Sequence, residues 1–163
     1  MLGINVMNAF ATGQLEYSLK KLGYDAAALQ ALREEGYLLW KGKNDQTSLL
    51  VPSADLDALF VINTLSYIDP EHDGRLLALA LHLNLSPVHT MSACIALDVE
   101  QNTLCLRYTH DLGGSGADTL LLALENAQAL AEQVRQVIET FRRDQGRPSG
   151  QTSLSRQSSA LMR

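Results

Sequence analysis

The chain of 163 residues is long enough for one domain with a sizeable core and too short for two. Its apolar fraction of 46% excludes wholesale disorder, and its formal net charge of −5 combines an acidic body, 1–143, with a basic end, 144–163. An acidic body argues against nucleic acid or an anionic membrane surface as the main partner. We find neither an apolar run long enough to span a membrane nor a signal-peptide pattern at the start, so we expect a cytoplasmic protein without membrane insertion.

The first predicted element is an amphipathic helix over 4–22, and Gly23 follows it where a helix C-cap belongs. The apolar face of this helix is formed by Ile4, Met7, Phe10, Ala11, Leu15, Leu19 and Leu22. The next segment, 25–35, has two interpretations. It is either a short helix capped by Asp25 and ended by Gly36, or an irregular lead into the first strand.

Three short apolar runs, 37–41, 47–51 and 58–68, are separated by turn-rich breaks. This pattern predicts a three-stranded antiparallel meander. The first run is apolar on both faces and contains the only tryptophan, Trp40, which we assign to the core rather than to a partner contact.

A second helix is predicted directly after the meander. Asp69 is placed to be its N-cap and Pro70 its first helical residue, and Ser86-Pro87 would end it. Its apolar stripe consists of Leu76, Leu77, Ala80, Leu81 and Asn84.

The stretch 93–108 predicts a β-hairpin that turns at Gln101-Asn102. This register places Val99 opposite Leu104, Leu97 opposite Leu106 and Ile95 opposite Tyr108, all on one apolar face. The opposite face carries small and mixed side chains, namely Cys94, Ala96, Asp98, Cys105 and Arg107. We interpret this second face as a surface that another layer approaches closely: the second helix, a twin subunit, or both.

The last predicted helix begins with Asp118 as its N-cap. Its apolar residues recur at alternating spacings of four and three, at Leu120, Leu124, Ala127, Ala131, Val134, Ile138 and Phe141. Such a stripe fits a coiled coil, but the two alanines in it favour close packing on a sheet. The elements together predict an α+β fold, an antiparallel five-stranded sheet with three helices in the order α-β-β-β-α-β-β-α. This domain would span 1–143, and 144–163 would form a flexible Ser/Gln/Arg-rich tail.

Motifs that could support catalysis or ligand binding are weak. The loop Gly113–Gly116 resembles a phosphate cradle, but no lysine or arginine follows it and Asp118 stands at the helix start. His110, Asp111 and Ser115 are too close in sequence for a catalytic triad, and the four histidines lack metal-ligand spacing. We therefore expect no enzyme, no cofactor and no metal, and a nucleotide-binding or enzymatic role for the glycine loop is the weakest alternative.

Several stretches resemble the class I type III secretion chaperones, the Tir-chaperone-like family. They are an amphipathic first helix ending in Leu22-Gly23, the leucine-rich helix Leu76–Leu85, the small-residue strand Ala93–Asp98, the strand Leu104–Arg107 and a long amphipathic last helix. The likeness extends over about residues 4–143.

The resemblance implies a homodimeric bacterial chaperone with a part in virulence and protein transport. It would bind the N-terminal region of type III secreted effectors and keep that region extended and competent for secretion. The alternative is a regulatory adaptor or anti-activator on the same fold that binds a non-secreted partner. Our candidates for effector binding are Met7, Phe10, Leu15, Tyr37, Leu39, Leu49 and Val51. Our candidates for the dimer interface are Leu77, Leu81, Asn84, Cys94, Ala96 and Asp98.

Overall fold

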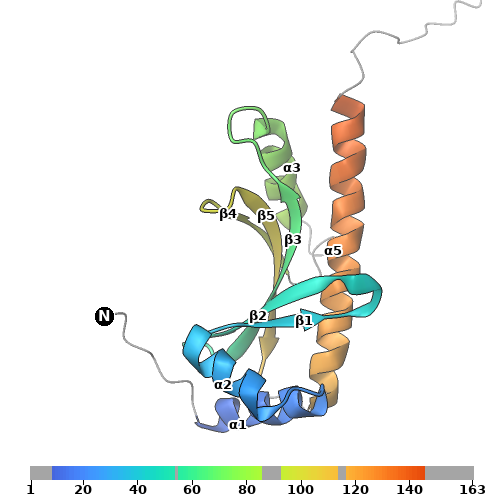
Figure 1. The fold of residues 1–163 in the computed structure, drawn as a ribbon. Helices are drawn as coiled ribbons and strands as arrows, with labels where there is room; N and C mark the ends of the chain where they lie inside the picture. The colour runs from blue at the N-terminus through green and yellow to red at the C-terminus, as the bar shows by residue number, and fades with distance from the viewer. Residues whose placement is uncertain (1–8, 54, 86–92, 114–116, 146–163) are drawn as a thin grey trace, which may run out of the picture.

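A computed structural model describes residues 9–53, 55–85, 93–113 and 117–145 of the chain (Figure 1). The α-helices are α1 (Ala9–Lys21), α2 (Ala26–Glu35), α3 (Gly74–Asn84) and α5 (Ala117–Gln145), and a short 3₁₀ helix, η1, spans Lys43–Asp45. The strands are β1 (Leu38–Lys41), β2 (Thr47–Ser53), β3 (Ala58–Tyr67), β4 (Cys94–Asp98) and β5 (Thr103–Asp111).

The five strands form one antiparallel sheet in the order β1-β2-β3-β5-β4. This arrangement confirms the predicted α+β fold and the meander of the first three strands. The long helix α5 runs along the sheet and packs on β3 and β5, while α1 lies across the N-terminal part of α5 (Figure 1). The helices bury their apolar sides against one face of the sheet, so none of the described elements forms a layer over the opposite face in the monomer.

The prediction of three helices is wrong, because the described part of the chain contains four α-helices. Of the two interpretations of the segment 25–35, the short helix is correct and the irregular lead into the first strand is wrong, because this segment forms the helix α2. Its N-cap Asp25 accepts a hydrogen bond from the backbone N–H of Ala28 at 2.8 Å. Gly36 ends it in the left-handed conformation, with φ of 80°. Leu29 and Leu32 then bury the apolar side of α2 in the core.

The apolar stripe predicted for the last helix is the centre of the core. Its members Leu120, Leu124, Ala127, Ala131, Val134 and Ile138 are all buried, and Phe141 is partly buried. They pack on the sheet, which confirms the choice of a sheet over a coiled coil. Asp118 lies within the first turn of α5 rather than before the helix, since α5 begins at Ala117.

Trp40 belongs to the core, as predicted. Its side chain is 9% exposed and packs in one cluster with Leu38, Leu50 and Val61. On the same strand Leu39 points to the other face and is 58% exposed. The alternation of side chains along β1 therefore separates a buried side from an open one.

The hairpin of β4 and β5 forms in a register that differs from the prediction by two residues. Leu97 pairs with Leu104 and Ile95 with Leu106, so the turn is longer than expected. The cause is Asp98, whose carboxylate accepts hydrogen bonds from the backbone N–H groups of Glu100 and Gln101 and starts the turn early. A shift of two residues leaves every side chain on its predicted face, but it places Val99 in the turn, where it is 71% exposed.

The helix α3 begins at Gly74, four residues beyond the start predicted from Asp69 and Pro70. The carboxylate of Asp69 instead holds a tight turn, accepting from the Glu71 N–H at 3.0 Å and contacting Nδ1 of His72 at 2.8 Å. Its local hydrogen bonds compete with helix formation and delay it. The first predicted helix is described from Ala9, so its residues 4–8 lie outside the described part of the chain, and Gly23 ends it with φ of 94°, as predicted.

Candidate functional site

The candidate site is the uncovered face of the sheet, which we call the outer face. The strand register aligns one row of residues straight across it: Leu39, Leu49, Ile62, Arg107 and Cys94. The apolar members of this row lie on β1, β2 and β3. The guanidinium of Arg107 lies over the ring of Phe60, 5.0 Å from its centroid, and borders the apolar area.

A hollow of about 240 Å³ lies on the outer face. It is lined by apolar, small and polar side chains, namely Leu39, Leu49, Ile62, Thr47, Thr64, Thr103, Cys105, Asp98 and Gln101. The apolar part of this hollow can accept apolar side chains from a partner, and the exposed hydroxyls of Thr47 and Thr64 can hydrogen-bond to that partner.

The predicted effector-binding residues divide into two groups. Tyr37 is 41% exposed and Leu39 58% exposed, and Leu49 and Val51 are partly buried. By strand alternation these four lie on the outer face or directly before it. Leu15, in contrast, is 3% exposed and lies inside the core, away from this face. Met7 lies outside the described residues, and Phe10 belongs to α1, where its side chain is not described.

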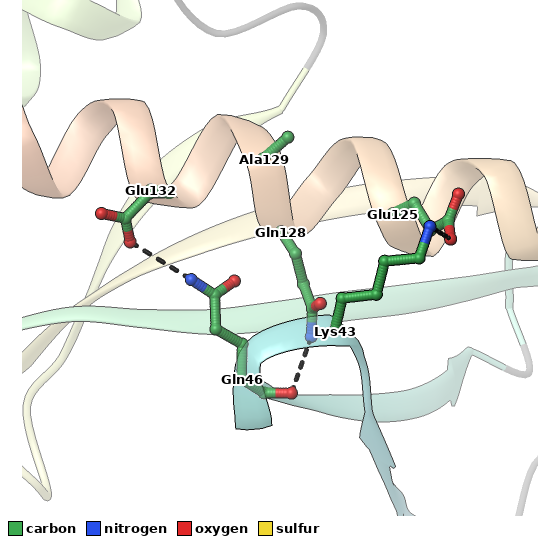
Figure 2. A pocket seen from close by; sticks show the side chains of 6 residues that line it. All are labelled: Lys43, Gln46, Glu125, Gln128, Ala129 and Glu132. Carbon is green, nitrogen blue, oxygen red and sulfur yellow. Dashed lines mark hydrogen bonds and ion pairs between the residues drawn. The ribbon is translucent and has the colours of Figure 1, made fainter.

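The turn between β1 and β2 is held on α5 by polar contacts (Figure 2). The side-chain amide of Gln128 donates to the backbone carbonyl of Gln46 at 3.0 Å and to Oγ of Ser48 at 3.1 Å. Nζ of Lys43 lies 2.8 Å from the carboxylate of Glu125, and a pocket of about 260 Å³ lies between these groups. The contacts fix the hairpin that carries the apolar row.

The buried end of this network continues into the sheet. Oγ of Ser48 donates to Oδ1 of Asn63 at 2.7 Å, and both residues are almost fully buried. This bond satisfies Oδ1 of Asn63, whereas Nδ2 of Asn63 is buried without a hydrogen-bond partner among the described residues, so the network is only partly satisfied. Sequence reasoning missed Gln128, although its position four residues after Leu124, on the otherwise apolar side of an amphipathic helix, is the signal that could have found it.

The titratable groups do not assemble into a reactive cluster in the described part of the chain. Burial lowers the pKa of His110, and the neighbouring carboxylate of Asp111 opposes this with a smaller effect. The described residues contain no group of three or more ligating side chains suited to a metal. Of the loop Gly113–Gly116, which we discounted as a phosphate cradle, only Gly113 is described, so that expectation lies largely outside the described residues. Among the described helices, none has the length and apolar character needed to cross a membrane.

Residues 14–135, from α1 into α5, match the model of a family described as the Tir chaperone protein (CesT) family. The chain belongs to this family. The resemblance inferred from the sequence is therefore confirmed, and the Tir chaperone family is a family of chaperones rather than of enzymes.

Three solved structures share the fold of this Tir chaperone family member. The HopA1-SchA chaperone-effector complex matches with 16% identity and a TM-score of 0.53, covering 78% of this chain and 94% of the other. The ExoU-SpcU complex from the type III secretion system of Pseudomonas aeruginosa matches with 14% identity and a TM-score of 0.53, covering 76% and 93%. The ExsC-ExsE complex matches with 16% identity and a TM-score of 0.54, covering 68% and 89%. No curated protein matches the chain in sequence.

The predicted dimer residues of this Tir chaperone family member lie on α3 and β4. Leu81 is 69% exposed, Ala96 is exposed on the outer face, and Leu77, Cys94 and Asp98 are partly buried. Asn84 is already engaged within the chain, because its side chain bonds to both backbone groups of Ile95. Sequence reasoning missed three further exposed apolar side chains on these two elements and their adjoining turns, namely Leu85, Leu97 and Val99.

Proposed function

We propose that this protein is a cytoplasmic chaperone that binds the N-terminal region of type III secreted effectors and keeps it extended for export. The observation that carries the proposal is an outer face left open and apolar in a chain that belongs to the Tir chaperone family. Two of the solved structures that share its fold are complexes. One is the HopA1-SchA chaperone-effector complex, and the other is the ExoU-SpcU complex from a type III secretion system.

The geometry of the outer face suits an extended effector segment, which we call the client, better than a folded protein. An unfolded segment presents main-chain N–H and C=O groups that can pair with the edge of a sheet, and its side chains fill pockets beside that edge. The hollow on the outer face lies next to the edge strand β1, because Leu39 of β1 is among its lining residues. The client would stay bound without chemical change, so we propose binding without enzymatic turnover.

We also propose that the protein acts as a homodimer that uses α3 and β4. Four apolar side chains in this region are strongly exposed in the monomer: Leu81, Leu85, Leu97 and Val99. Exposed apolar groups gathered in one region are typical of protein interfaces. Light scattering should give twice the monomer mass for the wild type, and Ala96→Glu or Leu81→Glu should give a monomer with an unchanged circular dichroism spectrum. A wild type that is monomeric at micromolar concentration would contradict this proposal.

Effector binding is tested by titrating the protein with the first 100 or so residues of an effector encoded beside its gene. Leu39→Asp should weaken binding by tenfold or more, since it places a charge in the apolar row. Leu122→Asp is the matched control, because Leu122 on α5 is also 58% exposed but lies away from the outer face. Equal affinities of the two variants would show that the outer face is not the binding surface.

The identity of the captured partner separates a chaperone from a regulatory adaptor on the same fold. In a strain with an intact secretion system, a chaperone should co-purify with a protein that is later found outside the cell. A partner that always remains inside the cell would favour the adaptor.

A further inference from the structure

Arg107 is an exposed cation on the outer face that has no ion-pair partner among the described residues. It belongs to β5 and continues the apolar row of the outer face, opposite Ile62 of β3. Nζ of Lys41, on β1, lies 2.8 Å from the carboxylate of Asp45, so the charge of this lysine is already paired. None of the ion pairs between described residues includes Arg107. A client on the outer face therefore meets an unneutralised positive charge beside the apolar row.

The guanidinium of Arg107 is held in place by an aromatic ring. It lies over the ring of Phe60, 5.0 Å from the ring centroid. A side chain that is already held in this way loses less conformational freedom when it binds a partner. The N–H donors of a guanidinium lie in one plane and match the two oxygens of a carboxylate. Arg107 is thus prepared to bind a carboxylate.

The hollow on the outer face also contains an acidic group, Asp98, but its charge is stabilised within the chain. Its carboxylate accepts hydrogen bonds from the backbone N–H groups of Glu100 and Gln101. Hydrogen bonds to a carboxylate favour its charged form. Of Asp98 and Arg107, it is Arg107 whose charge lacks such a partner in the described part of the chain, so the complementary client is acidic rather than basic.

Building on the proposed function, we infer that the outer face selects effector segments with an aspartate or glutamate close to apolar residues, and that Arg107 binds this carboxylate. The row from Leu39 to Arg107 crosses three strand spacings, roughly 14 Å, and four residues of extended chain span roughly 13 Å. The acidic residue of the client therefore lies within about four positions of an apolar residue that enters the hollow beside Leu39. Arg107 separates such clients from purely apolar or basic ones.

Arg107→Gln tests the contribution of the charge. Binding is measured with the effector fragment of the binding assay. The loss of one charge-assisted contact corresponds to roughly 3- to 20-fold weaker binding by Arg107→Gln. Arg143→Gln is the matched control, because it also removes an exposed positive charge but lies in the last turn of α5, and its affinity should equal that of the wild type. Equal affinities of the two variants would overturn the inference.

Neutral variants of the fragment identify the carboxylate. Each aspartate or glutamate near an apolar residue of the fragment is replaced singly by asparagine or glutamine. One replacement should weaken binding to the wild type as much as Arg107→Gln does and have no further effect on Arg107→Gln, because both changes remove the same contact. If every replacement has the same effect on the wild type and on Arg107→Gln, Arg107 does not bind a client carboxylate.

Two further results separate this inference from the other proposals. Arg107 is the register partner of Cys94, a candidate for the dimer interface, so light scattering should give the same mass for Arg107→Gln as for the wild type. A fall to half that mass would assign Arg107 to the dimer and contradict the inference. If the wild type binds no effector fragment, or if Leu39→Asp binds as tightly as Leu122→Asp, the proposed function fails instead, so the two failures are distinguishable.

Discussion

Gly42, at the end of the β1–β2 hairpin that carries the apolar row, tests how that hairpin is held on α5. Its φ of −89° and ψ of −162° are open to any residue, so the backbone itself does not require glycine. The requirement comes from Gln128. A Cβ at position 42 would overlap Oε1 of Gln128 and lie 2.8 Å from its Cδ and 2.9 Å from its Nε2. Gly42→Ala must therefore displace the Gln128 amide.

The cost follows from the hydrogen bonds that this amide makes. Gln128 is 5% exposed and donates to Gln46 and to Ser48, and moving it weakens both bonds in a buried place. At about 0.5–1.5 kcal/mol for each bond, the loss is about 1–3 kcal/mol. Alanine is less flexible than glycine in the unfolded chain, which stabilises the folded state by about 0.4–1 kcal/mol and offsets part of this loss. We expect Gly42→Ala to lower the free energy of unfolding by roughly 1–2 kcal/mol.

Urea unfolding measures this change, with Gly13→Ala as the matched control. Gly13 lies inside α1, and a Cβ added there would meet no neighbouring atom within 4 Å, so alanine should stabilise the protein by roughly 0.5–1 kcal/mol. In a Gln128→Ala background the clash is absent, and Gly42→Ala should become neutral or slightly stabilising. If the cost of Gly42→Ala stays the same in that background, contact with Gln128 is not its cause.

Three further predictions concern the core, the β4 edge and pH. Leu106→Ala should lower the free energy of unfolding by about 2–5 kcal/mol in urea denaturation because Leu106 is fully buried, and an equal cost for the 42% exposed Leu97 would contradict the observed burial. Asn84→Ala should remove both hydrogen bonds to Ile95 and speed hydrogen exchange at the Ile95 amide. Unchanged exchange at this amide would show that the Asn84 side chain does not protect the edge of β4. Burial lowers the pKa of His110 below its ordinary value of 6.5, so the unfolded state binds more protons and stability falls as pH drops below about 6.5. His110→Gln should reduce the pH dependence of the free energy of unfolding between pH 7.5 and 5.5. The lowered pKa of Asp69 affects this free energy only below about pH 3.8.

The apolar patterns of the sequence predicted much of the fold because they report which side of an element is buried. The stripe from Leu120 to Phe141 predicted both α5 and its packing on the sheet, and the alternation around Trp40 separated the inner side of β1 from the outer. Leu39 and Leu49 were effector-binding candidates only through the family resemblance, and the strand pairing places both on the outer face, opposite to Trp40. Family membership was also predicted from element order and residue pattern, and the match over 14–135 confirms it.

Tertiary structure decided the features that periodicity leaves open. A two-residue shift keeps all side chains on their faces, so the pattern alone could not set the register of β4 on β5, and the local hydrogen bonds of Asp98 did. Asp69 and Asp73 are equally good cap residues by type, and the turn around Asp69 placed the helix start at Gly74. The contacts of Tyr24 with Leu39 and of Gln128 with Ser48 join residues 15 and 80 positions apart. Only the folded chain brings such groups within hydrogen-bonding distance, because a hydrogen bond needs a short distance and a suitable angle. The local sequence around either residue does not indicate which distant residue will meet these conditions.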